Sequence, residues 1–123
     1  MEIKIEKTIT ITDQDIDDIM VTALEGGINY HCVEVEVIDG DYKGSKYASG
    51  VISKGGSLLL IDEEDEQYNS ALNKERFING LTMFLKDNGH IIEEDGTIDC
   101  GNIDADDADL IIQYACFGEQ IFG

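Results

Sequence analysis

Residues 12–37 read TDQDIDDIMVTALEGGINYHCVEVEV, and within this stretch the spacing of the apolar residues changes from a helical period to a strand period. Apolar side chains recur at helical spacing over residues 16–24, behind Thr12 and Asp15, which form the pattern of a capping box. Gly26 and Gly27 follow and are expected to end this helix. Residues 33–37 alternate valine with glutamate, which predicts a strand with one buried face. The stretch therefore predicts a helix followed by a strand.

Further strand patterns lie on either side of this stretch. Residues 3–11 read IKIEKTITI, in which isoleucines occupy odd positions only, and this alternation predicts a first strand. Beyond the central strand, the apolar run 58–61 and the segment 67–72 flank a charged turn and are expected to form a hairpin. Residues 42–53 suit either a strand or a short helix, and of the two a short helical turn over residues 48–52 is expected.

The second half of the chain holds two more helix patterns. Asn73 is a good N-cap for a helix that ends at Asn88. Asp104 begins another helix, which ends at Gly118. The shorter strand segments expected in this half are residues 91–92, 97–100 and 121–122.

The order of these elements predicts a single α+β domain over residues 1–123. About three helices are expected to pack on an antiparallel or mixed sheet of four to six short strands, because the elements do not follow repeated βαβ units. A chain of 123 residues lies in the usual size range of one domain. Proline is absent, so the turns depend on 13 glycines and on Asn and Asp.

The charge of the chain is strongly negative. It carries 27 Asp and Glu against 8 Lys and Arg, a formal net charge of −19, with a sequence pI near 4.1. Binding to phosphates needs clustered basic residues, so direct binding of DNA or RNA is disfavoured and none is expected. A field of this sign attracts cationic surfaces instead, which predicts a basic partner.

Neither a membrane segment nor a disulfide framework is expected. No apolar run approaches the roughly 18 to 20 residues that span a bilayer, and residues 1–8 do not form the apolar core of a signal peptide. The three cysteines are an odd number without C-x-x-C spacing, which predicts reduced thiols. We therefore expect a cytoplasmic protein.

Residue patterns for metal or phosphate chemistry are incomplete. The residues that faintly follow the start of a calcium loop are Asn102, Asp104, Asp106 and Asp109, but the required later Gly and Glu are missing. The residues that would have to converge on zinc, or on a Cys and His nucleophilic pair, are His31, Cys32, His90 and Cys100. Their spacing follows no familiar pattern, and their convergence is left open. No glycine-rich phosphate loop is present. We expect no metal, no cofactor and no enzymatic activity.

Several acidic residues have an ordinary role in folding, at helix starts or on the solvent face of a strand. Two groups lack such a role: five consecutive acids at residues 62–66, and the stretch 87–123, which has ten acids and no Lys or Arg. An aromatic ring in a connection can serve as a binding anchor. The residues predicted to bind a partner are Asp62, Glu63, Glu64, Asp65, Glu66, Glu93, Glu94, Asp95, Asp99 and Tyr30.

Residues 23–30 (ALEGGINY) and 111–118 (IIQYACFG) resemble small acidic proteins of prophages and conjugative elements in Gram-positive gut bacteria. The likeness covers most of the chain, including residues 47–49 and 95–99. In that group a tryptophan is expected after the tyrosine, where this chain has His31. The resemblance implies a mobile element, whose short acidic proteins include inhibitors of host defences that imitate nucleic acid, as some anti-CRISPR proteins do.

Two hypotheses of function follow. The first is a non-enzymatic inhibitor whose acidic face occupies the nucleic-acid channel of a basic host nuclease or defence protein. The second is a small homo-oligomeric module, for instance a homodimer, that binds a small ligand or a host protein through an apolar surface while its acids serve solubility.

Overall fold

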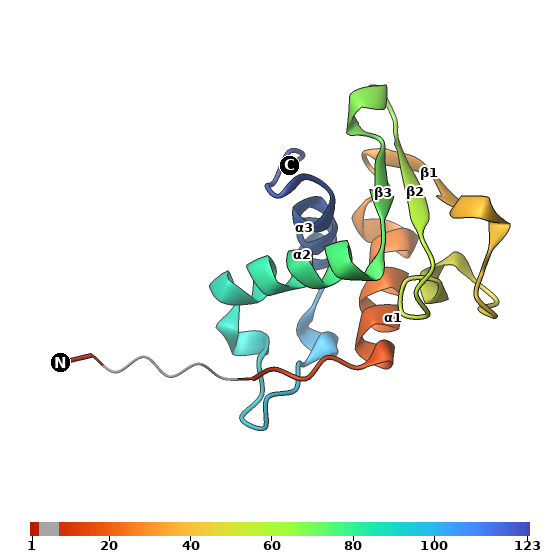
Figure 1. Cartoon of the computed structure of the whole chain (residues 1–123). Coiled ribbons are helices and arrows are strands. Elements are labelled where there is room, and N and C mark those ends of the chain that lie inside the picture. Colours follow the sequence, from red (N-terminus) through yellow and green to blue (C-terminus); the bar gives the residue numbers. More distant parts are fainter. Residues whose placement is uncertain (3–7) are drawn as a thin grey trace.

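A computed structural model of the chain describes residues 1–2 and 8–123 (Figure 1). Those residues form three α-helices and one antiparallel sheet of three strands, connected by short helical turns and loops. The elements in chain order are α1 (Asp13–Thr22), β1 (Cys32–Val37), β2 (Leu58–Asp62), β3 (Ser70–Leu72), α2 (Lys74–Asp87) and α3 (Ala105–Phe117). The predicted α+β class is confirmed.

The three helices begin at the residues that the sequence predicts. Thr12 and Asp104 each form a reciprocal capping box at the start of α1 and α3. The side chain of Asn73 accepts a hydrogen bond from the N–H of Arg76, 2.9 Å away, at the start of α2. α3 ends at Gly118, whose φ of 73° is the left-handed conformation that glycine adopts without strain. Capping therefore defines the helix boundaries locally.

The sheet has the strand order β1-β2-β3, so β2 is its central strand. Leu58 and Leu60 of β2 are buried, and so is Leu72 of β3. In β1 the pairing with β2 shifts between Cys32 and Glu34. A bulge of this kind breaks the alternation of faces. As a result Cys32 is buried while Val33 is 59% exposed, which the valine and glutamate alternation did not predict.

The core lies between the sheet and the helices. Phe77, Leu81 and Phe84 on one face of α2 are buried against α3, which contributes Ile111 and Ile112. Burial of each such side chain stabilises the fold by about 1.5–3 kcal/mol. The other fully buried large side chains are Ile16, Ile19, Met20, Ile28, Ile52, Leu58, Leu72 and Ile91.

Several predicted strands are not seen. The strand predicted over residues 3–11 lies partly outside the described residues, and residues 8–11 form no strand. The hairpin predicted from residues 91–92 and 97–100 is reduced to one bridge between Ile92 and Ile98. Around this bridge the N–H of Glu93 donates to the carbonyl of Thr97 and the N–H of Asp99 donates to the carbonyl of Ile91, so the two segments are paired but too briefly to form strands. With three strands described, the prediction of four to six is not confirmed.

Two other segments differ in detail from the prediction. The return strand of the hairpin begins only at Ser70, because residues 66–68 form a 3₁₀ turn. The short helical turn expected at residues 48–52 is a 3₁₀ turn at Ala48–Gly50. Residues 121–122 form no strand and bind a side chain of α3 instead. Of the helices formed by residues 1–2 and 8–123, none combines the length and the apolar character needed to cross a membrane.

Candidate functional site

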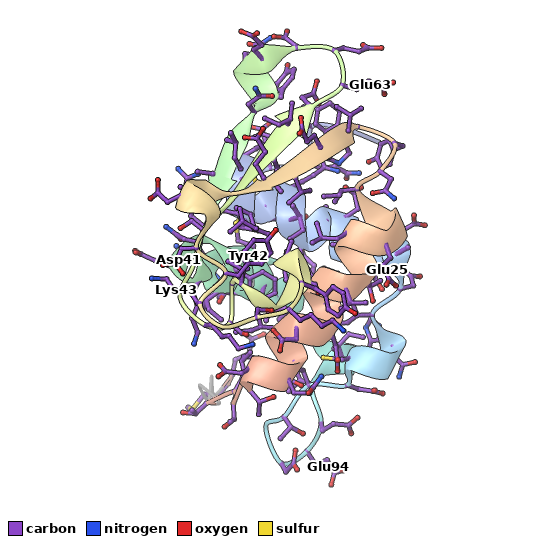
Figure 2. The ribbon with its side chains drawn as sticks, turned by 90° about the vertical axis from the view of Figure 1, so that its right-hand side faces the viewer. Glu25, Asp41, Tyr42, Lys43, Glu63 and Glu94 are labelled. Atoms are coloured by element: carbon purple, nitrogen blue, oxygen red, sulfur yellow. The ribbon has the colours of Figure 1, made fainter. Side chains whose placement is uncertain are left out.

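The predicted acidic residues fall into two clusters at opposite ends of the molecule. Residues 62–66 form the tip of the hairpin of β2 and β3, and residues 93–95 form a loop after α2 (Figure 1). Glu63 and Glu94, one from each cluster, lie at opposite ends of the view in Figure 2. The structure therefore does not bring the predicted binding residues together on one surface.

At the hairpin tip, two of the five acids organise the turn itself. Oδ2 of Asp62 accepts hydrogen bonds from the N–H groups of Glu64 (3.0 Å) and Asp65 (2.9 Å). Asp65 accepts from the main chain and the side chain of Gln67, and these hydrogen bonds lower the pKa of Asp65. Glu63, Glu64 and Glu66 are exposed. The tip thus presents glutamates on a turn that aspartates hold in place.

Aspartates also hold the loops of the second cluster. Oδ1 of Asp95 accepts from the N–H of Thr97 at 3.0 Å and from its hydroxyl at 2.6 Å. Asp99 caps the turn Cys100–Asn102 by accepting from the N–H of Gly101. Asp95 and Asp99 therefore have a role in folding, which the sequence analysis did not assign to them. Glu93 and Glu94 are exposed.

Tyr30 connects the hairpin end to a buried polar network. Its side chain is 52% exposed, but its hydroxyl donates to Oδ2 of Asp109 over 2.6 Å. Asp109 lies on α3 and is buried. It also accepts from Nε2 of Gln113 at 2.9 Å, and its Oδ1 lies 2.8 Å from Nε2 of His31. Three side chains thus converge on one buried carboxylate.

Gln113 extends this network to residues 121 and 122. Its Oε1 accepts the N–H groups of Ile121 (2.7 Å) and Phe122 (2.8 Å), and its side chain is fully buried. The ring of Phe122 is stacked on the imidazole of His31, with centroids 4.3 Å apart. Tyr68 lies edge-on to Phe122 at 5.4 Å. The segment after α3 is therefore fastened beside Tyr30 and His31.

A hollow of about 190 Å³ lies where these elements meet. It is lined by Tyr30, His31, Asp62, Glu63, Glu64, Phe122 and Gly123. Here the structure does bring together predicted residues from different parts of the chain: the tyrosine and three acids of the hairpin tip. The sequence analysis missed His31, Gln113 and Phe122 as partners of Tyr30. The sequence did contain a signal for this network, because Asp109 and Gln113 lie four residues apart on the apolar face of the predicted helix. Buried polar groups need hydrogen-bond partners, so the pair indicated that other polar side chains would meet it.

The structure does not bring together as one set the four residues considered for zinc. His31 contacts Asp109 and Phe122, whereas the thiol of Cys100 lies near Asp15. Throughout residues 1–2 and 8–123, no group of three His, Cys, Asp or Glu side chains is arranged to hold a metal ion.

The thiols are poorly suited to nucleophilic chemistry. Burial, followed by the charge of Asp15, raises the pKa of Cys100 to about 12. Burial also raises the pKa values of Cys32 and Cys116. Because the thiolate is the reactive form, all three cysteines are held in the less reactive state at neutral pH.

The network around Tyr30 should be visible in an alkaline titration. Burial, then the hydrogen bond to Asp109, raises the pKa of Tyr30 from 10.0 to about 12. Since the folded-state pKa lies above the unfolded one, the contribution of the neutral phenol to stability is complete below pH 10 and is lost as the pH rises through about 12. The measurement is phenolate absorbance of the wild type minus that of Tyr30→Phe, with circular dichroism to follow unfolding.

Tyr47→Phe is the matched control, since Tyr47 is 63% exposed and lies outside this network. A wild-type minus Tyr30→Phe curve with its midpoint near pH 10 would show that Asp109 does not hold the hydroxyl in solution.

Comparison of the chain with protein-family models, with curated proteins and with solved structures finds no match.

Proposed function

We propose that the protein is a non-enzymatic inhibitor, encoded by a phage or mobile element, that binds a basic nucleic-acid-binding protein of the host. The observation that carries this proposal is a net charge of −19 on a folded α+β domain. Such a field accelerates the encounter with cationic surfaces and repels nucleic acid itself.

Internal ion pairs neutralise little of this charge. The lysines that form ion pairs between described residues are Lys43, with Asp41 at 3.0 Å, and Lys74, with Asp13 at 3.3 Å. Both pairs are largely exposed, and exposed pairs contribute only about 0–1 kcal/mol. With 27 acids against 8 basic residues, a cationic partner would reduce the repulsion among the remaining carboxylates.

The arrangement of the acids supports a division of roles. Glu25, Asp41, Glu63 and Glu94 project from different sides and ends of the molecule (Figure 2). The acids therefore form no single continuous band among the described residues, an arrangement that favours the solubility role of the second hypothesis, and the proposal depends on the total charge for a general attraction of basic partners. We assign the specific contact with the partner to the hairpin end, where Tyr30, Glu63 and Glu64 line the same hollow.

Affinity capture from a bacterial lysate tests the proposal. The tagged full chain should retain a basic nucleic-acid-binding protein at low salt. It should release that protein when DNA or RNA is added, or when salt shortens the Debye length from about 10 Å at 0.1 M to about 3 Å at 1 M. Purified partner and chain should then compete with nucleic acid in a binding assay. Failure to recover such a partner, or binding indifferent to salt and nucleic acid, contradicts the proposal.

A second candidate function is supported by an apolar groove. The groove has a volume of about 400 Å³, which lies within the range of about 300–1,000 Å³ for small-molecule sites. It is lined by Ile9, Ile11, Ile78, Leu81, Thr82, Leu85, Lys86 and Ile92. A module that binds a small ligand, or a second copy of itself, through this groove should lose binding in Ile78→Glu. The same module should be unaffected by Glu63→Gln with Glu64→Gln.

A further inference from the structure

The hollow at the hairpin end has the composition of a site for a planar cation. Resting on the function proposed above, we propose that this hollow is the specific contact point and that it takes the guanidinium group of an arginine side chain of the basic partner. The proposal follows from the size of the hollow, its aromatic walls and its acidic rim.

The size of the hollow suits one side chain. Its volume is about 190 Å³. It is smaller than the roughly 300 Å³ at which drug-sized ligand sites begin. A single long side chain matches this volume, whereas a folded segment of a partner does not.

Three rings with fixed positions line the hollow. The hydroxyl of Tyr30 is held by Asp109, and the main chain of Phe122 is held by Gln113. His31 lies between them, edge-to-face with Tyr30 (centroids 4.7 Å apart) and stacked on Phe122. The faces of tyrosine and phenylalanine rings attract cations within about 6 Å of the ring centroid, so Tyr30 and Phe122 are the rings proposed to contact the guanidinium, and rings that are already ordered lose little entropy on binding.

The rim supplies the opposite charge. The carboxylate of Asp62 is engaged with the turn amides, which leaves the exposed Glu63 and Glu64 to face an incoming cation. The main chain of Glu63 is tied to this site, because its N–H donates to the carbonyl of His31 over 2.8 Å. Carboxylates bind guanidinium in a bidentate manner.

Arginine fits these features better than lysine does. Its guanidinium is planar, stacks on aromatic faces and is more weakly hydrated, whereas a lysine ammonium is a compact and strongly hydrated charge. An anion is disfavoured by the three acids that line the hollow. The expected order of binding is therefore arginine, then lysine, with no binding of phosphate.

The test uses N-acetyl-arginine amide as the probe, with N-acetyl-lysine amide and inorganic phosphate as comparisons. Each is titrated at physiological salt into the full ¹⁵N-labelled chain. Amide shift changes with the arginine probe should centre on Tyr30, His31, Glu63, Glu64 and Phe122. The lysine probe should produce weaker changes at the same residues.

Two charge variants form the matched pair. Glu63→Gln with Glu64→Gln removes two charges at the hollow, whereas Glu93→Gln with Glu94→Gln removes two charges at the opposite end. The first variant should weaken binding of the arginine probe about tenfold, the loss expected for a charge-assisted hydrogen bond. The second should change it by less than about twofold, because those charges are distant and screened.

A third variant tests the aromatic wall. Phe122→Leu keeps the main-chain hydrogen bonds to Gln113 but removes the ring. This variant should weaken binding of the arginine probe by about two- to fivefold, which is the change in affinity that corresponds to one cation–π contact at an exposed site. Thermal melts of all variants show whether the fold is retained.

Shift changes spread equally over both ends, or equal weakening by both charge variants, would overturn the assignment and show only general attraction. The outcome for the partner is separate. If a captured partner binds both charge variants equally well, the hollow is not the contact point although the proposed function stands. Arginine binding in the hollow without any basic partner supports the site and overturns the function.

Discussion

Gly80→Ala should destabilise the protein by roughly 2 kcal/mol, although alanine is the better helix former by about 1 kcal/mol. Gly80 lies in α2 at its contact with α3. A Cβ atom there would come within 2.6 Å of the main-chain N of Ala115 and of the carbonyl O of Ile111. These are backbone atoms and cannot rotate away, so the two helices would have to move apart. Urea unfolding should show a lower midpoint with an unchanged slope.

Gly26→Ala is the matched control for this effect. Gly26 lies in the helical turn that follows α1, its φ is not positive, and a Cβ there meets no atom within 4 Å. This variant should be neutral or more stable by up to about 1 kcal/mol. Equal unfolding midpoints for Gly80→Ala and the wild type would mean that α2 and α3 are less closely packed than the structure shows.

Gln113→Leu should cost about 2 kcal/mol and release residues 119–123 from the hollow. The amide of Gln113 is fully buried and serves Asp109, Ile121 and Phe122 together. Leucine supplies similar bulk but none of these hydrogen bonds. A buried polar group that loses its partner costs about 1–3 kcal/mol. Urea unfolding measures the loss, and amide hydrogen exchange at Ile121 and Phe122 measures the release.

Two further substitutions separate hydrogen bonding from size. Gln14→Leu makes the same change on the exposed face of α1 and should alter stability by less than about 0.5 kcal/mol. Gln113→Glu keeps an acceptor for residues 121 and 122 but places a second carboxylate beside Asp109, so its loss of stability should be partly relieved at lower pH. Slow hydrogen exchange retained at Ile121 and Phe122 in Gln113→Leu would show that the ring of Phe122 alone holds the segment.

Because residues 119–123 line the hollow through Phe122 and Gly123, Gln113→Leu should also weaken the arginine probe. Gln113 acts on the site only through the segment it holds. It is therefore a positioning residue, and binding should fall together with the hydrogen-exchange protection of Phe122.

The helices were well predicted from the sequence, and the strands less well. The boundaries of a helix are marked by residues that lie close together in the sequence. The structure reproduces the starts predicted at Thr12, Asn73 and Asp104 and the end predicted at Gly118. A strand is stable only when paired, so an alternating pattern does not establish one. Residues 91–92 and 97–100 pair with each other only at one bridge, and the main-chain N–H groups of residues 121 and 122 bond to Gln113 instead of to a strand.

The candidate site was predicted only in part. Tyr30 and the acids at residues 62–66 were identified, but as separate features, and the acids at residues 93–95 were grouped with them by charge alone. The structure places Tyr30 and residues 62–64 beside one hollow, whereas Glu94 lies at the other end of the molecule. Neither closeness in the sequence nor a similar composition indicates how far apart two loops lie in the folded protein.

By itself, the sequence determined the charge of −19, the three helices with their caps, and the α+β class. These properties depend on composition and on periodicity over a few turns of chain. Only the tertiary structure decided that His31 meets Asp109, 78 positions away, that Gln113 fastens residues 121 and 122, and that Val33 is exposed by a bulge. Such contacts form where independently folded elements pack together, and a buried polar atom takes the partner that this packing places within reach.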